Sequence, residues 1–275
     1  MSETLYQVTN RVATITLNRP EKLNAWTATM DNEVHSHVIE AERDDQVRVI
    51  VLTGAGRGFC AGADMSLLSS VALQGIQNER DAAVRLGGSN SPSAGGPPDF
   101  QKKHTYFLGV EKPILAAVNG PAVGLGLVIA LYCDLRLASD TARFSTTFSQ
   151  RGLIAEYGMA WMLPRIVGLP NALDLLYSAR TIDAAEALQL GLVNRLFPQE
   201  SFTDRVNEFA GDLASRVSPR SLRVIKRQVY AGMFQTLGES CDLALTEMIA
   251  SLKSEDFREG VAHFLEKRAP QFTGK

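Results

Sequence analysis

Two stretches of the chain share one order of hydrophobic and glycine-rich positions. In the first, the run VRVIVLT at 47–53 suits a strand buried on both faces, and a glycine-rich turn follows at 54–62. In the second, ILAAV at 114–118 precedes Asn119-Gly120-Pro121 and an apolar run at 127–133. Both stretches predict a strand, a glycine turn and a helix.

Glycines at the start of a helix allow backbone to approach a ligand, and the unpaired N–H groups of the first turn favour negative charge there. Two such turns can each present one N–H to the same oxygen, which is what a thioester enolate requires. When the second stretch is taken alone, close packing of a buried helix is the favoured explanation of Gly124 and Gly126.

The remaining pattern indicates strands alternating with helices early in the chain and helices gathered late, so we expect an α/β core with a helical C-terminal region. Residues 87–98 are rich in Gly, Ser and Pro and predict a loop, which is either a passive insertion or a lid beside the site. The other predicted elements are a hairpin at 5–9 and 12–18, a strand at 134–139, and helices at 25–43, 65–86, 219–231, 237–253 and 254–268.

Composition mainly argues against certain classes of protein and site. The chain has 275 residues, a net charge of −2 and 45% hydrophobic residues, which is typical of a globular protein without nucleic-acid or membrane partners. Three widely spaced cysteines and the absence of a signal-like N-terminus predict a reduced, cytoplasmic protein. His35 and His37 do not share a helix face, so no metal site is expected. The basic residues at 216–227 predict a solvated or subunit-facing surface, although a macromolecule-binding function stays open.

Five segments in the same order resemble the crotonase superfamily, the enoyl-CoA hydratase/isomerase family. They are NRPEKLNA at 18–25, GFCAGADM at 58–65, KPILAAVNGPAVGLG at 112–126, RTIDAAEALQLGLVNRLFP at 180–198 and FLEKRAPQF at 264–272. The resemblance implies a ββα spiral core at 1–200, a helical oligomerisation region at 201–275 and a homotrimer or hexamer. It also implies an acyl-CoA thioester as substrate, with coenzyme A part of that substrate and no separate cofactor.

The resemblance further implies a set of site residues. The backbone N–H groups of Ala63 and Leu125 would form the oxyanion hole, and a backbone donor does not depend on its side chain. Phe264 and Lys267 would close over coenzyme A phosphates, often from a neighbouring subunit. The other residues implied in substrate or coenzyme A binding are Lys22, Ala25, Ala61, Asp64, Met65, Gly124 and Phe148.

The proton-transfer residues depart from the hydratase pattern. The two positions that carry glutamates in typical hydratases align with Val128 and Phe148, neither of which moves a proton. Glu156 instead matches the carboxylate of family isomerases that shift a double bond from carbon 3 to carbon 2, and one carboxylate suits that reaction. A hydratase with another water geometry, or a non-catalytic coenzyme A or macromolecule-binding protein, remains an alternative.

The surroundings of Glu156 bear on its function as a base. We expect apolar side chains nearby to raise its pKa toward working pH, namely those of Phe148, Ile154, Tyr157, Met159 and Trp161. A solvated loop carboxylate would be the ordinary alternative for a glutamate.

Overall fold

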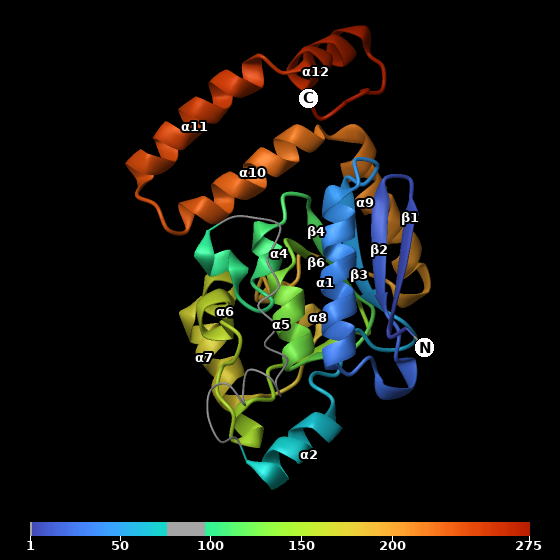
Figure 1. The fold of residues 1–275 in the computed structure, drawn as a ribbon, viewed down its shortest axis with the longest axis vertical. Helices are drawn as coiled ribbons and strands as arrows, with labels where there is room; N and C mark the ends of the chain where they lie inside the picture. Colours follow the sequence, from blue (N-terminus) through green and yellow to red (C-terminus); the bar gives the residue numbers. More distant parts are fainter. Residues whose placement is uncertain (1, 76–96) are drawn as a thin grey trace.

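A six-stranded, mostly parallel sheet forms the centre of the computed structural model, which describes residues 2–75 and 97–275 (Figure 1). Its strand order is β1-β2-β3-β4-β6-β9; β1 and β2 form an antiparallel hairpin, and the other neighbours are parallel. The strands are β1 (Thr4–Thr9), β2 (Val12–Leu17), β3 (Val49–Gly54), β4 (Ile114–Val118), β6 (Leu135–Ser139) and β9 (Arg195–Phe197).

Alternate residues of these strands face two different cores, as the two-residue repeat of a strand requires. Ile50, Leu52 and their neighbours face the larger core, which includes α1 (Ala28–Arg43) and α5 (Leu125–Tyr132). Val49 and Val51 face α9 (Phe202–Arg216) on the other side of the sheet. The sheet is therefore covered on both faces, with α1 in front and α9 behind in Figure 1.

Shorter elements extend this α/β core. A second sheet has the order β5-β7-β8, with β5 (Ala122–Val123) lying in the turn before α5. The other members of that sheet are β7 (Arg143–Ser145) and β8 (Ile182–Asp183). The helices around the core are α2 (Met65–Gln74), α4 (Tyr106–Gly109), α6 (Met159–Val167), α7 (Leu169–Ser178) and α8 (Ala184–Gln189). Single 3-10 turns occupy Pro20–Lys22, Pro98–Gln101, Ser149–Arg151 and Gln199–Ser201.

Three helices extend away from this body at the C-terminal end, α10 (Pro219–Gly232), α11 (Leu237–Leu252) and α12 (Glu255–Glu266) (Figure 1). α11 has no buried residue within the described chain, although many of its side chains are apolar. The basic cluster at 216–227, predicted to be a solvated or subunit-facing surface, is only partly at the surface of this chain. Lys226 of α10 is 8% exposed, and its ammonium lies 2.9 Å from the carboxylate of Asp134, which anchors α10 to the core.

The predicted hairpin, strands and C-terminal helices are present with small shifts of their ends. The helix expected at 25–43 begins instead at Ala28, because Thr27 caps it by accepting a hydrogen bond from the N–H of Met30 at 3.0 Å. For the helix expected at 65–86, α2 accounts for residues up to 74. The loop expected at 87–98 lies outside the described residues except for its last two.

The division of the chain into a core at 1–200 and an oligomerisation region at 201–275 stays a prediction. Within the second of these regions, α9 packs on the sheet rather than with α10–α12. Within the described residues no helix is long and apolar enough to cross a membrane. In the same part of the chain, His, Cys, Asp and Glu side chains form no group of three or more that could hold a metal ion.

Candidate active site

Main-chain hydrogen bonds join the two glycine turns. The N–H groups of Phe59 and Cys60 donate to the carbonyl oxygen of Pro121 at 3.1 and 3.0 Å, and the N–H of Val123 donates to the oxygen of Cys60 at 2.9 Å. A Cβ on Gly126 would lie 2.2 Å from that same Cys60 oxygen, closer than any real contact. The chain therefore needs glycine at 126 for the start of α5 to lie against the first turn.

Two buried asparagines hold the loop that leads into the first turn. The amide nitrogen of Asn119 donates to the carbonyl oxygens of Gly54 and Gly56, both at 2.9 Å. Asn24 is fully buried and donates from its amide to the oxygens of Ala55 and Gly58, at 3.0 and 2.8 Å. These bonds satisfy carbonyl groups that a buried irregular loop would otherwise leave without partners.

The two N–H groups identified as oxyanion donors are available. In residues 2–75 and 97–275, neither the N–H of Ala63 nor that of Leu125 donates to any protein acceptor. Leu125 is the first residue of α5, where an N–H has no partner inside the helix. Ala63 pairs with Trp26 as an isolated bridge, through bonds made by its neighbours Gly62 and Asp64. Both residues line one cavity.

This cavity has a volume of about 470 Å³ and a mostly apolar lining. It lies among the first turns of α1, α2 and α5 and the loop from Thr147 to Tyr157. Six of the residues expected in the site line it: Ala63, Asp64, Gly124, Leu125, Phe148 and Glu156. A volume of this size is within the range of small-molecule sites.

Asp64 is committed to local structure. It caps α2 by accepting from the N–H of Ser66 at 2.9 Å, and it pairs with the guanidinium of Arg19 at 2.8 Å. The hydrogen bonds from Ser66 and the Arg19 charge hold the pKa of Asp64 at about 2. A carboxylate this acidic is a poor base at neutral pH.

Glu156 differs in each of these respects. Burial raises the pKa of its half-buried carboxyl group, and within the described residues this carboxylate accepts no hydrogen bond and forms no ion pair. Asp64 and Glu156 are the acidic residues among the described residues that line the cavity. Glu156 is thus the lining carboxylate whose environment suits proton transfer.

The expected apolar surroundings of Glu156 are only partly correct. Phe148 and Tyr157 line the cavity with it. Ile154 points into solvent and is 76% exposed, so its inclusion was wrong. Met159 is buried inside α6, and Trp161 stacks on Phe234 with ring centroids 5.5 Å apart, outside the cavity lining. The loop turns between 154 and 161, so sequence neighbours face in different directions.

The positions aligned with the hydratase glutamates have different environments. Val128 is 1% exposed within α5 and belongs to the hydrophobic core, whereas Phe148 lines the cavity. No acidic group occupies either position.

Several lining residues had no place in the sequence-based set. Trp26 is 3% exposed, and its indole N–H donates to Asp31 at 3.0 Å. Lys103 pairs with the other oxygen of Asp31 at 3.5 Å, and Arg151 also lines the cavity. Neither basic residue belongs to a glycine turn or another recognisable pattern, so only the fold brings them to the cavity.

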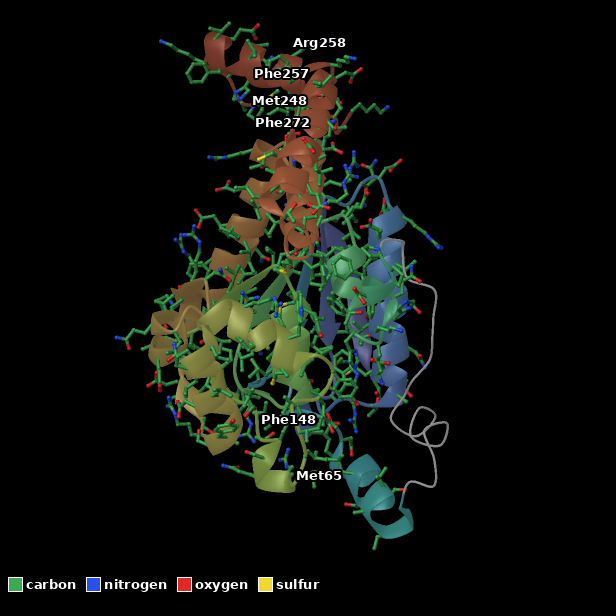
Figure 2. The ribbon with its side chains drawn as sticks, turned by 90° about the vertical axis from the view of Figure 1, so that its left-hand side faces the viewer. Met65, Phe148, Met248, Phe257, Arg258 and Phe272 are labelled. Atoms are coloured by element: carbon green, nitrogen blue, oxygen red, sulfur yellow. The ribbon has the colours of Figure 1, made fainter. Side chains whose placement is uncertain are left out.

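The remaining expected residues lie outside this cavity lining. Lys22 is exposed, while Ala25 and Ala61 are partly buried in the backbone network around the first turn. Met65 is 56% exposed at the start of α2. Phe264 and Lys267 belong to the α12 end of the molecule, and Figure 2 places Phe257 and Arg258 of that helix far from Met65 and Phe148. The chain therefore does not bring Phe264 and Lys267 to its own cavity.

The chain is similar to known proteins over nearly its whole length. The family model described as enoyl-CoA hydratase/isomerase matches residues 7–275. The chain is 34% identical to 1,2-epoxyphenylacetyl-CoA isomerase of Escherichia coli K12, with 98% of each chain covered. Among solved structures, the enoyl-CoA hydratase of Bacillus anthracis superposes with a TM-score of 0.87 at 28% identity, over 99% of this chain and 100% of the other. That of Polaromonas sp. JS666 gives 0.85 at 27% identity, over 98% and 99%.

The fold expected from the sequence is confirmed by these structural neighbours, and the family match extends over nearly the whole chain. The relatives carry both isomerase and hydratase names. The chain belongs to the enoyl-CoA hydratase/isomerase family of the crotonase superfamily and is an acyl-CoA enzyme of that family.

Proposed function

We propose that the protein isomerises 3-enoyl-CoA to 2-enoyl-CoA thioesters, with Glu156 as the base. The observation that carries this proposal is that Glu156 is the one available carboxylate among the described residues that line the cavity. Glu156 has a raised pKa and no protein partner among the described residues, whereas Asp64 is held by Arg19 and Ser66. One carboxylate is enough for a proton shift within a substrate, but the usual addition of water uses two.

The reaction begins when the thioester carbonyl oxygen accepts hydrogen bonds from the N–H groups of Ala63 and Leu125. The Glu156 carboxylate takes a proton from carbon 2, and the electron pair of that bond moves into the carbonyl to form an enolate. The two backbone donors stabilise the negative oxygen. Glu156 then returns the proton to carbon 4, where the electron pair of the double bond between carbons 3 and 4 forms the new C–H bond. The enolate pair moves to form the double bond between carbons 2 and 3 and the carbonyl is restored, so the composition of the substrate does not change.

The environment of the cavity favours these steps. Each N–H donor is fixed by backbone that already lies in place, so it needs little reorganisation as charge develops. Burial disfavours the charged form of Glu156, which makes the carboxylate a stronger base than one in water. Phe148 and Tyr157 contribute apolar surface beside it.

We also infer that the C-terminal helices form a subunit interface in a homotrimer or hexamer. Apolar side chains on α11 and α12 remain about half exposed, among them Leu245, Met248, Leu252, Phe257 and Val261. Exposed apolar surface of this extent is typical of an association site. In such an assembly Phe264 and Lys267 would be available to a coenzyme A site of a neighbouring subunit, and the other coenzyme A contacts would come from Lys22, Ala25, Ala61 and Met65.

Product analysis tests the reaction. The protein is incubated with 3-enoyl-CoA and, separately, 2-enoyl-CoA thioesters of matched length, and the products are identified by chromatography and mass. We expect conversion of the 3-enoyl to the 2-enoyl isomer without a mass change, lost in Glu156→Gln. The control is Glu200→Gln, the same substitution at an exposed glutamate outside the cavity.

Three outcomes would overturn the proposal. Turnover retained by Glu156→Gln would remove Glu156 as the base. A gain of one water by the 2-enoyl thioester would mean a hydratase, and coenzyme A thioester binding without turnover at any chain length would mean a binding protein.

A further inference from the structure

The loop that carries Glu156 is held from behind by a tyrosine on α5. The hydroxyl of Tyr132 donates a hydrogen bond to the carbonyl oxygen of Tyr157 at 2.5 Å. Tyr132 is 2% exposed and is the last residue of α5, and it is not among the residues that line the active-site cavity. Burial raises its pKa to about 12, so the hydroxyl keeps its proton at neutral pH.

The backbone at this point has an uncommon conformation. Tyr157 has φ of +50° and Gly158 has φ of +74°, so two consecutive residues after Glu156 are left-handed. A residue with a side chain adopts this region at a conformational cost, which surrounding contacts must offset. The Tyr132 hydrogen bond and the bond from the N–H of Met159 to the oxygen of Glu156, at 3.0 Å, are two such contacts.

The Tyr132 hydroxyl also occupies the space of a side chain at 158. A Cβ on Gly158 would lie 2.5 Å from the hydroxyl oxygen, while the next nearest atom, Cζ of the same ring, would be 3.8 Å away. Only the oxygen is too close, since 3.8 Å is an ordinary contact. The hydroxyl and the glycine therefore fit each other specifically.

A second set of contacts holds the side chain of Tyr157. Its ring meets His104 edge to face with centroids 5.0 Å apart, and His104 is 1% exposed. The His104 ring also meets that of Trp26 edge to face, at 6.0 Å. The Tyr157 ring is thus packed into the cavity wall, and its carbonyl is fixed by Tyr132.

We propose that Tyr132 is a positioning residue for Glu156, setting the orientation of the base through the carbonyl of Tyr157. One helix would then serve both halves of the site, because α5 begins at the Leu125 donor and ends at Tyr132. This inference rests on the proposed function of Glu156 as the base. Positioning contributes to rate because a small displacement of a reacting group lowers turnover sharply.

The first test is Tyr132→Phe, measured with the same 3-enoyl-CoA assay. We expect kcat to fall by roughly 10- to 100-fold, with little change in KM, since the residue does not line the cavity. The acidic limb of the kcat/KM profile should move to lower pH as a loosened loop exposes Glu156 to water. A purely structural function for Tyr132 would lower thermal stability without moving this limb.

The matched control is Tyr230→Phe. Tyr230 also donates a hydroxyl hydrogen bond, to Asp134 at 2.9 Å, but lies on α10 outside the cavity. This variant also loses one hydroxyl oxygen, so we expect it to be less stable but to have an unchanged kcat and pH profile.

The second test uses Gly158→Ala alone and with Tyr132→Phe. Alanine alone meets the hydroxyl and displaces the loop, so we expect kcat to fall at least as far as in Tyr132→Phe. In the double variant the contact with the hydroxyl is absent but the cost of alanine at a φ of +74° remains, so kcat should lie below that of Tyr132→Phe and well above the product of the two losses.

Two results would overturn the inference. One is Tyr132→Phe with kcat and pH profile like the unmodified protein while Glu156→Gln is inactive. The other is a double variant, Tyr132→Phe with Gly158→Ala, whose loss of kcat equals the product of the two single losses. If instead Glu156→Gln keeps its turnover, the proposed base is wrong, whatever the tyrosine variants do.

Discussion

Replacing Leu125 with proline would remove one oxyanion donor while retaining the helix. Proline has no N–H, and position 125 is the first residue of α5, where proline is well tolerated. A proline disfavours the helical region for the residue before it, and Gly124 lies outside that region, with φ of +52°, ψ of −118° and no Cβ to meet the proline ring. The Leu125 N–H donates to no acceptor among the described residues, so its removal breaks no hydrogen bond there.

The contribution of the Leu125 N–H to turnover is best measured by comparing Leu125→Pro with Leu125→Ala. The leucine side chain is 6% exposed, so either variant loses about 2–5 kcal/mol of stability from its truncation. Alanine retains the N–H and proline does not, and we expect the two to differ in stability by less than about 1 kcal/mol. Loss of the donor should lower kcat of the proline variant about 10²- to 10³-fold below the alanine variant, equivalent to about 2.7–4 kcal/mol.

The assay is steady-state turnover of a 3-enoyl-CoA at saturating substrate, with urea unfolding and circular dichroism on both variants. A proline variant that is folded and turns over within about tenfold of the alanine variant would refute Leu125 as a donor. Equal losses in both variants would assign the effect to the leucine side chain instead.

Three further results are expected. Gly126→Ala would bring a Cβ against the carbonyl oxygen of Cys60, and since backbone cannot easily give way, urea unfolding should show a loss of about 1–3 kcal/mol, together with reduced turnover. Glu156→Gln should raise the free energy of unfolding at pH 7, because the raised pKa of Glu156 means that its ionised form is disfavoured in the native state; the gain should disappear as pH falls below the pKa of an unfolded glutamate. Asp64→Asn should lower the free energy of unfolding at pH 7. The pKa of Asp64 is about 2 in the native protein, below that of an unfolded aspartate, so its ionised form stabilises the native state at any pH above the unfolded pKa. The difference between the two proteins should vanish as pH falls through 2.

The hydrophobic pattern predicted the two central strands most clearly because each is a nearly continuous apolar run. The run at 47–53 became β3, and that at 114–118 became β4, paired with it in parallel. The pattern did not predict strand order, because pairing depends on contacts between segments distant in sequence. Nor did it predict α9 (202–216) as a separate helix, because the C-terminal helices expected from the sequence begin at 219, and its packing behind the sheet depends on the tertiary fold.

The site was partly predictable for a related reason. Ala63 and Leu125 are marked by local glycine turns, and the turn geometry follows from the sequence around them. Lys103 and Arg151 carry no local signal, so the tertiary fold alone brings them to the cavity. Ile154 was misplaced because the hydrophobicity of a loop residue does not indicate its direction, and here the backbone turns it into water.

The length of α5 fixes the distance between the two ends of the site. The helix holds Leu125 and Tyr132 seven residues apart, a rise of roughly 10 Å, and its bonded backbone resists stretching. Residues 127–131 are packed in the core and can exchange for others of similar volume without altering that length. An insertion or deletion of one residue would instead turn one end by about 100° relative to the other. We therefore expect this helix to tolerate substitutions of similar volume but not insertions or deletions.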